Sequence, residues 1–175
     1  MIRRISIVCG LALAVGCSPK PEAAAPEKVS VSVQIPAGIE ASELRGFDAR
    51  WSAAVAEAKP DSAGIEQLRS IGSGATVEIY LGTWCSDSRR EVGRFLKGTE
   101  NVELPFEVRM FTLPREKPTW PQDERDLRFV PTFIVTRDGT EVGRIVESAP
   151  KGIENELAAL LAGIKTGLIT GRDDL

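Results

Sequence analysis

The pattern of hydrophobic and polar positions predicts strands at residues 76–81, 106–111 and 130–135. The segment 137–140, Arg-Asp-Gly-Thr, predicts a tight turn because Asp-Gly readily adopts the positive φ angles that hairpin turns need. Residues 141–146 are therefore expected to return antiparallel to 130–135.

Apolar residues spaced three and four apart predict helices before, between and after these strands. The expected helices are 41–58, with Phe47, Trp51 and Val55 on one face, then 63–71, 85–97, and a last helix with Ile153, Leu157, Leu160, Leu161 and Ile164 on one stripe. The strictly alternating residues 29–35 predict a further strand ahead of them. Residues 165–175 are polar and are expected to fray.

The start of the chain has the features of a secretion signal. A short basic segment precedes an apolar stretch at residues 5–15, which is too short to span a bilayer, and small residues then lead to Cys17. This ending resembles the lipobox of bacterial lipoproteins. The resemblance implies cleavage before Cys17, a lipid on Cys17 and, because Ser18 follows, sorting to the periplasmic face of the outer membrane. The alternative is ordinary secretion with cleavage after Ala25.

The expected organisation is one folded domain behind an anchor, since 175 residues suit a single domain with length left for a leader. Residues 1–16 are expected to be the lipoprotein signal peptide. Residues 17–28, rich in Pro, Ala and Glu, are expected to form a flexible tether behind the lipidated cysteine. The folded domain then covers 29–164, and 165–175 is the polar tail.

Composition excludes several kinds of function. The formal charge is −3, and removal of the leader with its two arginines leaves 20 basic against 25 acidic residues. Nucleic-acid binding needs a basic face, so no nucleic acid is expected. The chain has no histidine, which excludes Cys-His catalysis and histidine-held metals or haem. We expect no cofactor and no metal site.

The candidate chemistry lies at Trp84-Cys85, between the strand 76–81 and the helix predicted behind it. A cysteine at a helix start meets unpaired backbone N–H groups and the positive end of the helix dipole, and both favour the nucleophilic thiolate. Asp87 opposes this effect by its negative charge, whereas Arg89 and Arg90 support it. Alternatively, Cys85 is a buried, inert thiol and the two arginines are a solvated helix face.

The order of elements and two separated motifs resemble the thioredoxin fold over about Val29 to Gly163. One motif is Thr83-Trp84-Cys85 entering a helix; the other is Val130-Pro131-Thr132-Phe133 followed by the Asp-Gly hairpin. The resemblance implies an α/β fold with a central mixed β-sheet flanked by helices on both faces. It also implies a cis Pro131 facing the sulfur of Cys85, with Trp84 covering the site and the Val130 backbone free to pair with an extended substrate.

Two positions depart from the thioredoxin pattern. Ser88 stands where a second cysteine is expected, and Ile79 stands where thioredoxins often have a buried aspartate for proton transfer. The internal means of releasing a bound substrate is therefore absent. The Ser88 hydroxyl is expected to donate a hydrogen bond to the Cys85 thiolate. The candidate catalytic residues are thus Cys85 and Ser88.

The function that these residues indicate is monothiol thiol–disulfide exchange, in which Cys85 forms a mixed disulfide and an external thiol resolves it. Expected partners are envelope protein thiols or disulfides, or a low-molecular-weight thiol, and two chains joined through Cys85. The alternative is a redox-inactive module that holds an extended envelope protein in the cis-proline groove. A peroxidase lacks its usual Pro-x-x-x-Thr-x-x-Cys motif here, and copper delivery needs more soft ligands than one thiol.

Overall fold

The computed structural model describes residues 37–117, 120 and 125–175. The expected signal peptide, Cys17, the expected tether and the strand expected at 29–35 lie outside the described residues, as do residues 118–119 and 121–124 after the third strand. Among the described residues, none of the helices has both the length and the apolar character needed to cross a membrane.

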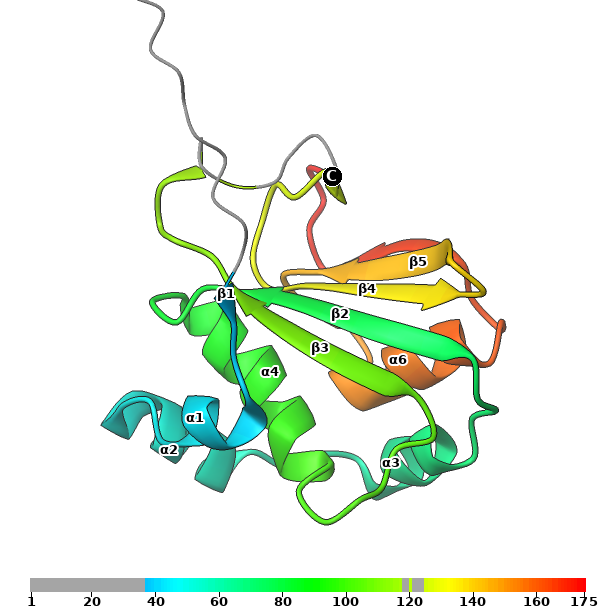
Figure 1. Ribbon diagram of the computed structural model, residues 1–175, viewed down its shortest axis with the longest axis horizontal. Helices are drawn as coiled ribbons and strands as arrows, with labels where there is room; N and C mark the ends of the chain where they lie inside the picture. The colour runs from blue at the N-terminus through cyan, green and yellow to red at the C-terminus, as the bar shows by residue number, and fades with distance from the viewer. Residues whose placement is uncertain (1–36, 118–119, 121–124) are drawn as a thin grey trace, which may run out of the picture. The chain divides into compact units, whose positions relative to one another are not determined.

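The centre of the domain is a mixed sheet of six strands in the order β1-β3-β2-β4-β5-β6. β2 pairs in parallel with β3 and antiparallel with β4, while β5 is antiparallel to β4 and parallel to β6. The strands are β1 (Ala37–Gly38), β2 (Ala75–Leu81), β3 (Glu107–Thr112), β4 (Thr132–Arg137), β5 (Thr140–Val146) and β6 (Gly167–Thr170) (Figure 1).

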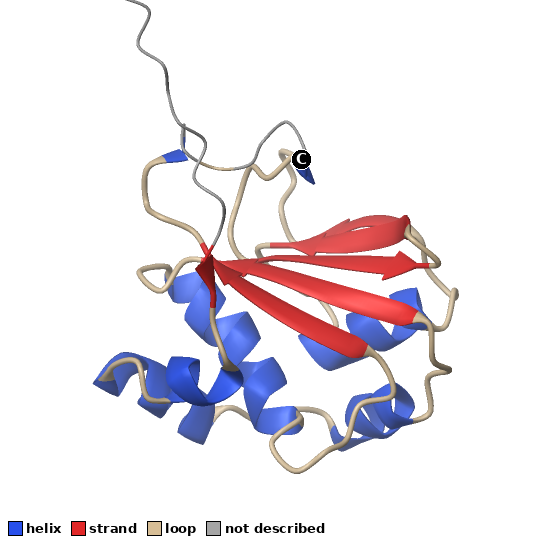
Figure 2. Ribbon diagram, viewed as in Figure 1, coloured by secondary structure: helices blue, strands red, loops and turns tan. Residues whose placement is uncertain are grey.

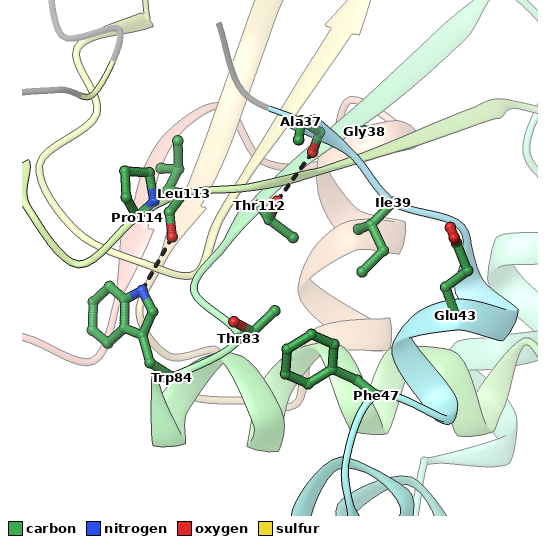
Figure 3. Close-up of a pocket in the computed structure, with 10 residues that line it drawn as sticks. All are labelled: Ala37, Gly38, Ile39, Glu43, Phe47, Thr83, Trp84, Thr112, Leu113 and Pro114. Atoms are coloured by element: carbon green, nitrogen blue, oxygen red, sulfur yellow. Dashed lines mark hydrogen bonds between the residues drawn. The ribbon is translucent and has the colours of Figure 1, made fainter. Parts of the chain in front are cut away.

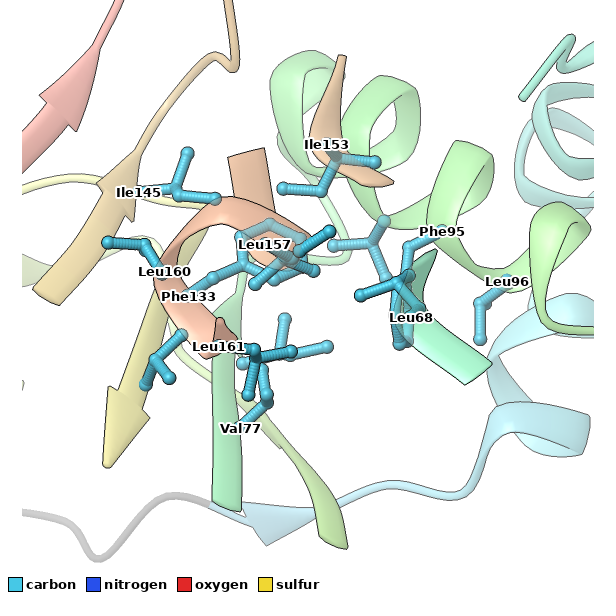
Figure 4. Packing of buried hydrophobic residues seen from close by; sticks show 14 of the residues in the cluster. Leu68, Val77, Phe95, Leu96, Phe133, Ile145, Ile153, Leu157, Leu160 and Leu161 are labelled. Carbon is cyan, nitrogen blue, oxygen red and sulfur yellow. The ribbon is translucent and has the colours of Figure 1, made fainter. Parts of the chain in front are cut away.

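Five helices contribute to one hydrophobic core with one face of this sheet. They are α1 (Ala41–Arg45), α2 (Ala49–Glu57), α3 (Ser62–Arg69), α4 (Ser86–Gly98) and α6 (Ile153–Leu161) (Figure 2). Val77 and Phe133 of the sheet pack there with Phe95 of α4 and with Leu157 of α6 (Figure 4). Burying these apolar side chains supplies the main drive for folding.

The opposite face of the sheet has a smaller core of its own. Tyr80 and Ile134 of the sheet are covered by Leu113, Trp120 and Leu127 from the connection between β3 and β4. Trp120 is 2% exposed and donates from its indole nitrogen to the Pro114 oxygen at 2.8 Å. The described part of this connection is largely loop.

The α/β thioredoxin-like fold is confirmed by the mixed sheet, its helices and the parallel β2–β3 pair beside the antiparallel β4–β5 hairpin. Asp138 and Gly139 adopt the positive φ angles, 52° and 78°, expected of the hairpin turn. The helices α1 to α4 and α6 lie on one face of the sheet. Side chains of the described part of the β3–β4 connection cover the second face.

Three other expectations are wrong, and one of them is the burial of Ile164, which follows the end of α6 and is 79% exposed. The helix expected at 41–58 is two helices, because the chain turns at Gly46 and Asp48 caps α2 by accepting from Trp51 N at 2.8 Å. Phe47 lies in this turn and is 53% exposed instead of facing the core. The tail expected to fray contains β6, which pairs with β5 from Gly143 to Val146.

Candidate functional site

Cys85 is the residue that caps the start of α4. Its backbone is extended, with φ −88° and ψ 131°, and its carbonyl accepts the first helical hydrogen bond from Arg89 N at 3.2 Å. Cys85 N donates to Gly82 O at 2.9 Å, which closes the turn between β2 and α4. The sulfur is free and partly exposed. It therefore lies at the positive end of a helix of 13 residues, as the sequence predicts.

The second half of the site is the Val130–Pro131 peptide bond, which is cis. This confirms the isomer that the thioredoxin resemblance implies. The Cys85 thiol lies 3.3 Å from the Val130 carbonyl oxygen and donates a hydrogen bond to it. Residues 45 positions apart are thus brought into contact by β2 and β4, which are neighbours in the sheet.

Ser88 lies close to Cys85 in sequence but its hydroxyl has another contact. The side chain is fully buried, and its Oγ accepts a hydrogen bond from Gly82 N at 3.1 Å. The hydrogen bond observed for the Cys85 sulfur goes to Val130 O instead of Ser88. Ser88 therefore fastens the turn that carries Cys85, which is a structural contact that its position alone did not indicate.

The carbonyl of Thr83 is a further anchor for this turn. It accepts the indole N–H of Trp51 at 2.9 Å and a guanidinium N–H of Arg89 at 3.4 Å. Trp51 is fully buried in α2, so it fixes the residue two positions before Cys85 from the main core. From the sequence, Trp51 was assigned to the core, and Arg89 was either a charge that favours the thiolate or part of a solvated helix face. No local pattern predicts that either side chain bonds to the Thr83 carbonyl.

Trp84 covers one side of the site. Its indole nitrogen donates to Leu113 O at 3.1 Å, and the guanidinium of Arg115 lies 5.0 Å from the ring centroid, a cation–π contact. Gly82 is required beneath the ring, because a Cβ there would lie 2.7 Å from the indole. Trp84 also lines a pocket of about 590 Å³ with Phe47 and the end of β3, as Figure 3 shows.

The charges next to Cys85 are largely paired. Arg90 contacts Asp87 and also Glu91, whose Oε1 lies 3.0 Å from Arg90 Nε. Burial raises the pKa of Glu91 above its usual value even though Arg90 pulls it down. The carboxylate of Asp87 therefore has a cation beside it, which weakens its repulsion of a thiolate at Cys85.

Ile79 occupies the position of the proton-transfer aspartate, and it is fully buried in the main core. Of the residues the structure describes, no three acidic, cysteine or histidine side chains gather in a way that could hold a metal ion. The site can thus bind or attack sulfur through Cys85, with the Val130–Pro131 backbone beside it and no ionisable group at the Ile79 position.

Comparison with known proteins finds solved structures with a similar fold. No protein-family model and no curated protein matches the chain. An HIV epitope scaffold aligns with a TM-score of 0.55 at 18% identity, covering 73% of this chain and 92% of that one. A Pseudomonas aeruginosa protein of unknown function aligns with a TM-score of 0.51 at 20% identity, covering 73% of this chain and 84% of that one. Thioredoxin f2 of Chlamydomonas reinhardtii aligns with a TM-score of 0.37 at 16% identity, covering 62% of this chain and 95% of that one.

Proposed function

We propose that this thioredoxin-like protein acts in the cell envelope, anchored by a lipid on Cys17, and exchanges thiols and disulfides through Cys85 alone. The observation that carries the proposal is the position of the Cys85 sulfur. It lies at the start of α4, 3.3 Å from the Val130 oxygen and beside the cis Pro131. A thiol at a helix N-terminus next to backbone that can pair with an extended chain suits attack on a protein disulfide.

The proposed reaction needs two external thiols. The Cys85 thiolate attacks one sulfur of a partner disulfide; a mixed disulfide forms, and the other partner sulfur leaves as a thiolate and takes up a proton. Ser88 cannot resolve this intermediate because it has no sulfur. An external thiol then attacks the Cys85 sulfur and releases the partner as a thiol. A second molecule of that thiol frees Cys85, so the partner is reduced and the external thiol is oxidised to its disulfide.

The test is to trap the mixed disulfide in cells. Rapid acid quenching followed by mass spectrometry should find defined envelope proteins or a small thiol on Cys85, and Cys85→Ser should abolish these adducts. Absence of adducts in the unaltered protein, together with slow alkylation of Cys85, contradicts the proposal. Fatty-acid labelling that is lost in Cys17→Ala tests the anchor separately.

A redox-inactive binding module is the second candidate, and the apolar core around Ile79 favours it. Thioredoxin-type turnover uses a buried base near the sulfur, and Ile79 offers none. In this reading the backbone at Val130 and Pro131 holds an extended envelope protein and Cys85 is dispensable. Unchanged partner capture and phenotype in Cys85→Ala would support this candidate and exclude the exchange reaction.

A further inference from the structure

The C-terminal segment after β6 reaches the cis-proline side of the Cys85 site. β6 pairs with β5 through Thr170, and Gly171 N then donates to Ser148 Oγ at 3.2 Å. Arg172 N donates to Thr170 Oγ1 at 3.1 Å, which fixes the direction of the next side chain. The chain is thus held on both sides of the point where Arg172 leaves the sheet.

The guanidinium of Arg172 makes three contacts. It lies 4.3 Å from the centroid of the Phe129 ring, and its Nη1 lies 2.5 Å from Glu147 Oε2. Its Nε and Nη2 contact the Asp174 carboxylate at 2.7 and 2.5 Å. About 31% of the side chain is exposed, so the guanidinium is screened only in part. Arg172 therefore joins two segments that are distant in sequence, at Phe129 and at Glu147.

Both segments adjoin the cis peptide directly. Phe129 immediately precedes Val130, and its carbonyl accepts the Thr132 hydroxyl at 2.8 Å. Glu147 N donates to Pro131 O at 2.8 Å. Glu147 also has a φ of 60°, a left-handed conformation that is costly for a glutamate and persists only where its surroundings hold it.

We propose that Arg172 is a positioning residue for the Cys85 site: through Phe129 and Glu147 it holds the Val130–Pro131 backbone in the place that an extended substrate needs. The effect on substrate rests on the proposed exchange function, whereas the effect on the backbone does not. Lys117 Nζ, 4.7 Å from the same Phe129 ring, adds a second cation to this support.

A merely structural role for Arg172 predicts a different result from a positioning role. If Arg172 only fastened β6, its loss would lower global stability and leave the backbone next to Cys85 unchanged in the folded state. If it positions that backbone, its loss loosens the Glu147–Pro131 hydrogen bond in the folded state. The exchange rate of the Glu147 amide hydrogen reports this bond directly.

The experiment compares Arg172→Ala and Arg172→Lys with Glu147→Gln, which removes the carboxylate charge that Arg172 contacts. The control is Arg69→Ala, which removes an exposed ion pair in α3. Amide exchange measured by NMR is expected to be about fivefold faster at Glu147 in Arg172→Ala. This factor corresponds to the stabilisation lost when one cation–π contact and one surface ion pair are removed. Arg172→Lys restores part of the protection because it keeps the charge. The Leu113 amide, bonded to Leu81 O at 2.8 Å, serves as the unchanged reference.

The functional arm uses two disulfides, an extended peptide bearing a mixed disulfide and a small aromatic disulfide. Arg172→Ala should slow reaction of Cys85 with the peptide by about fivefold and leave the small disulfide unaffected, because only the peptide needs the Val130 backbone. Unchanged Glu147 exchange, or equal effects on both disulfides, overturns the positioning role. If the unaltered protein reacts with neither disulfide, the exchange function fails and amide exchange alone decides for Arg172.

Discussion

The thiol of Cys85 donates a hydrogen bond to the carbonyl oxygen of Val130 across 3.3 Å. This bond exists only while the sulfur carries its proton, because a thiolate has no hydrogen to donate. Loss of the proton therefore activates the nucleophile and at the same time frees a backbone acceptor for the N–H of a bound chain. The two halves of the proposed site are linked through one oxygen atom.

Replacing Ser88 by cysteine should supply the missing resolving sulfur. Residues three apart at a helix start lie on the same side, so Ser88→Cys is expected to form a disulfide with Cys85. Free-thiol alkylation followed by mass spectrometry should show two protected sulfurs after mild oxidation and a mixed disulfide too short-lived to trap. Ser88→Ala is the matched control, since it loses the same contact to Gly82 N without adding sulfur. Two freely alkylated thiols would contradict the expected disulfide.

Replacing Trp51 by phenylalanine should disturb Cys85 from a distance. The change removes the indole donor to Thr83 O and is expected to lower the free energy of unfolding by about 1 kcal/mol, measured in urea. It should also change the alkylation rate of Cys85, because Thr83 belongs to the same turn. Ser52→Ala is the control, because it loses hydroxyl bonds to Arg45 O and Asp48 O at the start of the same helix. Equal alkylation rates in both variants would show that the Thr83 anchor does not position Cys85.

A methyl group at Gly82 should displace Trp84. The added Cβ would lie 2.7 Å from the indole, so Gly82→Ala is expected to break the bond to Leu113 O and cost about 1–3 kcal/mol of stability. The indole N–H resonance of Trp84 should shift in the NMR spectrum. Gly72→Ala, where nothing lies within 4 Å, is the control and should be nearly neutral. An unshifted resonance would mean that the turn relaxes around the methyl group.

The buried carboxylate of Glu154 should make stability depend on pH. Glu154 is fully buried; burial alone raises its pKa, but the hydrogen bonds from Arg94 at 2.6–3.0 Å prevail, and its pKa is lowered. A lowered folded-state pKa gives stability that is present above the ordinary pKa of 4.5 and is lost as pH falls through the folded value. Glu154→Gln should remove this dependence and cost about 2 kcal/mol at neutral pH, below the cost for a fully buried pair because Arg94 is partly exposed.

Glu91 provides a control, because it should make stability change with pH in the opposite direction. Burial raises its pKa, so its folded state binds the proton more tightly and stability falls as pH rises between the unfolded and folded values. Glu91→Gln should remove that fall. Urea titrations from pH 3 to pH 7 measure how the contribution of each carboxylate to the free energy of unfolding changes with pH. Slopes of the same sign for Glu154 and Glu91 would contradict the opposite pKa shifts of the two groups.

The parts of the site that follow from local sequence were predictable. Cys85 at the end of a strand pattern and Pro131 at the start of another are read from neighbouring residues, and the fold then brings them together. The contacts of Trp51 and Ser88 were not predictable in this way. Each bonds to a backbone atom whose position is set by the packing of a separate element, so no periodicity or spacing in the sequence predicts these bonds.

The same reason explains the differences in the fold. Gly167 to Thr170 shows no alternation strong enough to predict a strand, and it becomes one because β5 offers unpaired backbone groups beside it. The cover of the second sheet face comes from Trp120 and Leu127 in a Pro-rich connection, where apolar residues lie too irregularly to predict burial. Phe47 interrupts its helix because Gly46 and Asp48 end one helix and start the next.

The strand β6 also bears on how the protein behaves at high concentration. Open sheet edges are templates on which other chains add strands and aggregate, and natural proteins blunt them with short outer strands. β6 ends the β5 side of the sheet with four residues, half of them exposed, and leaves it through Gly171. Chain association along that border is therefore disfavoured.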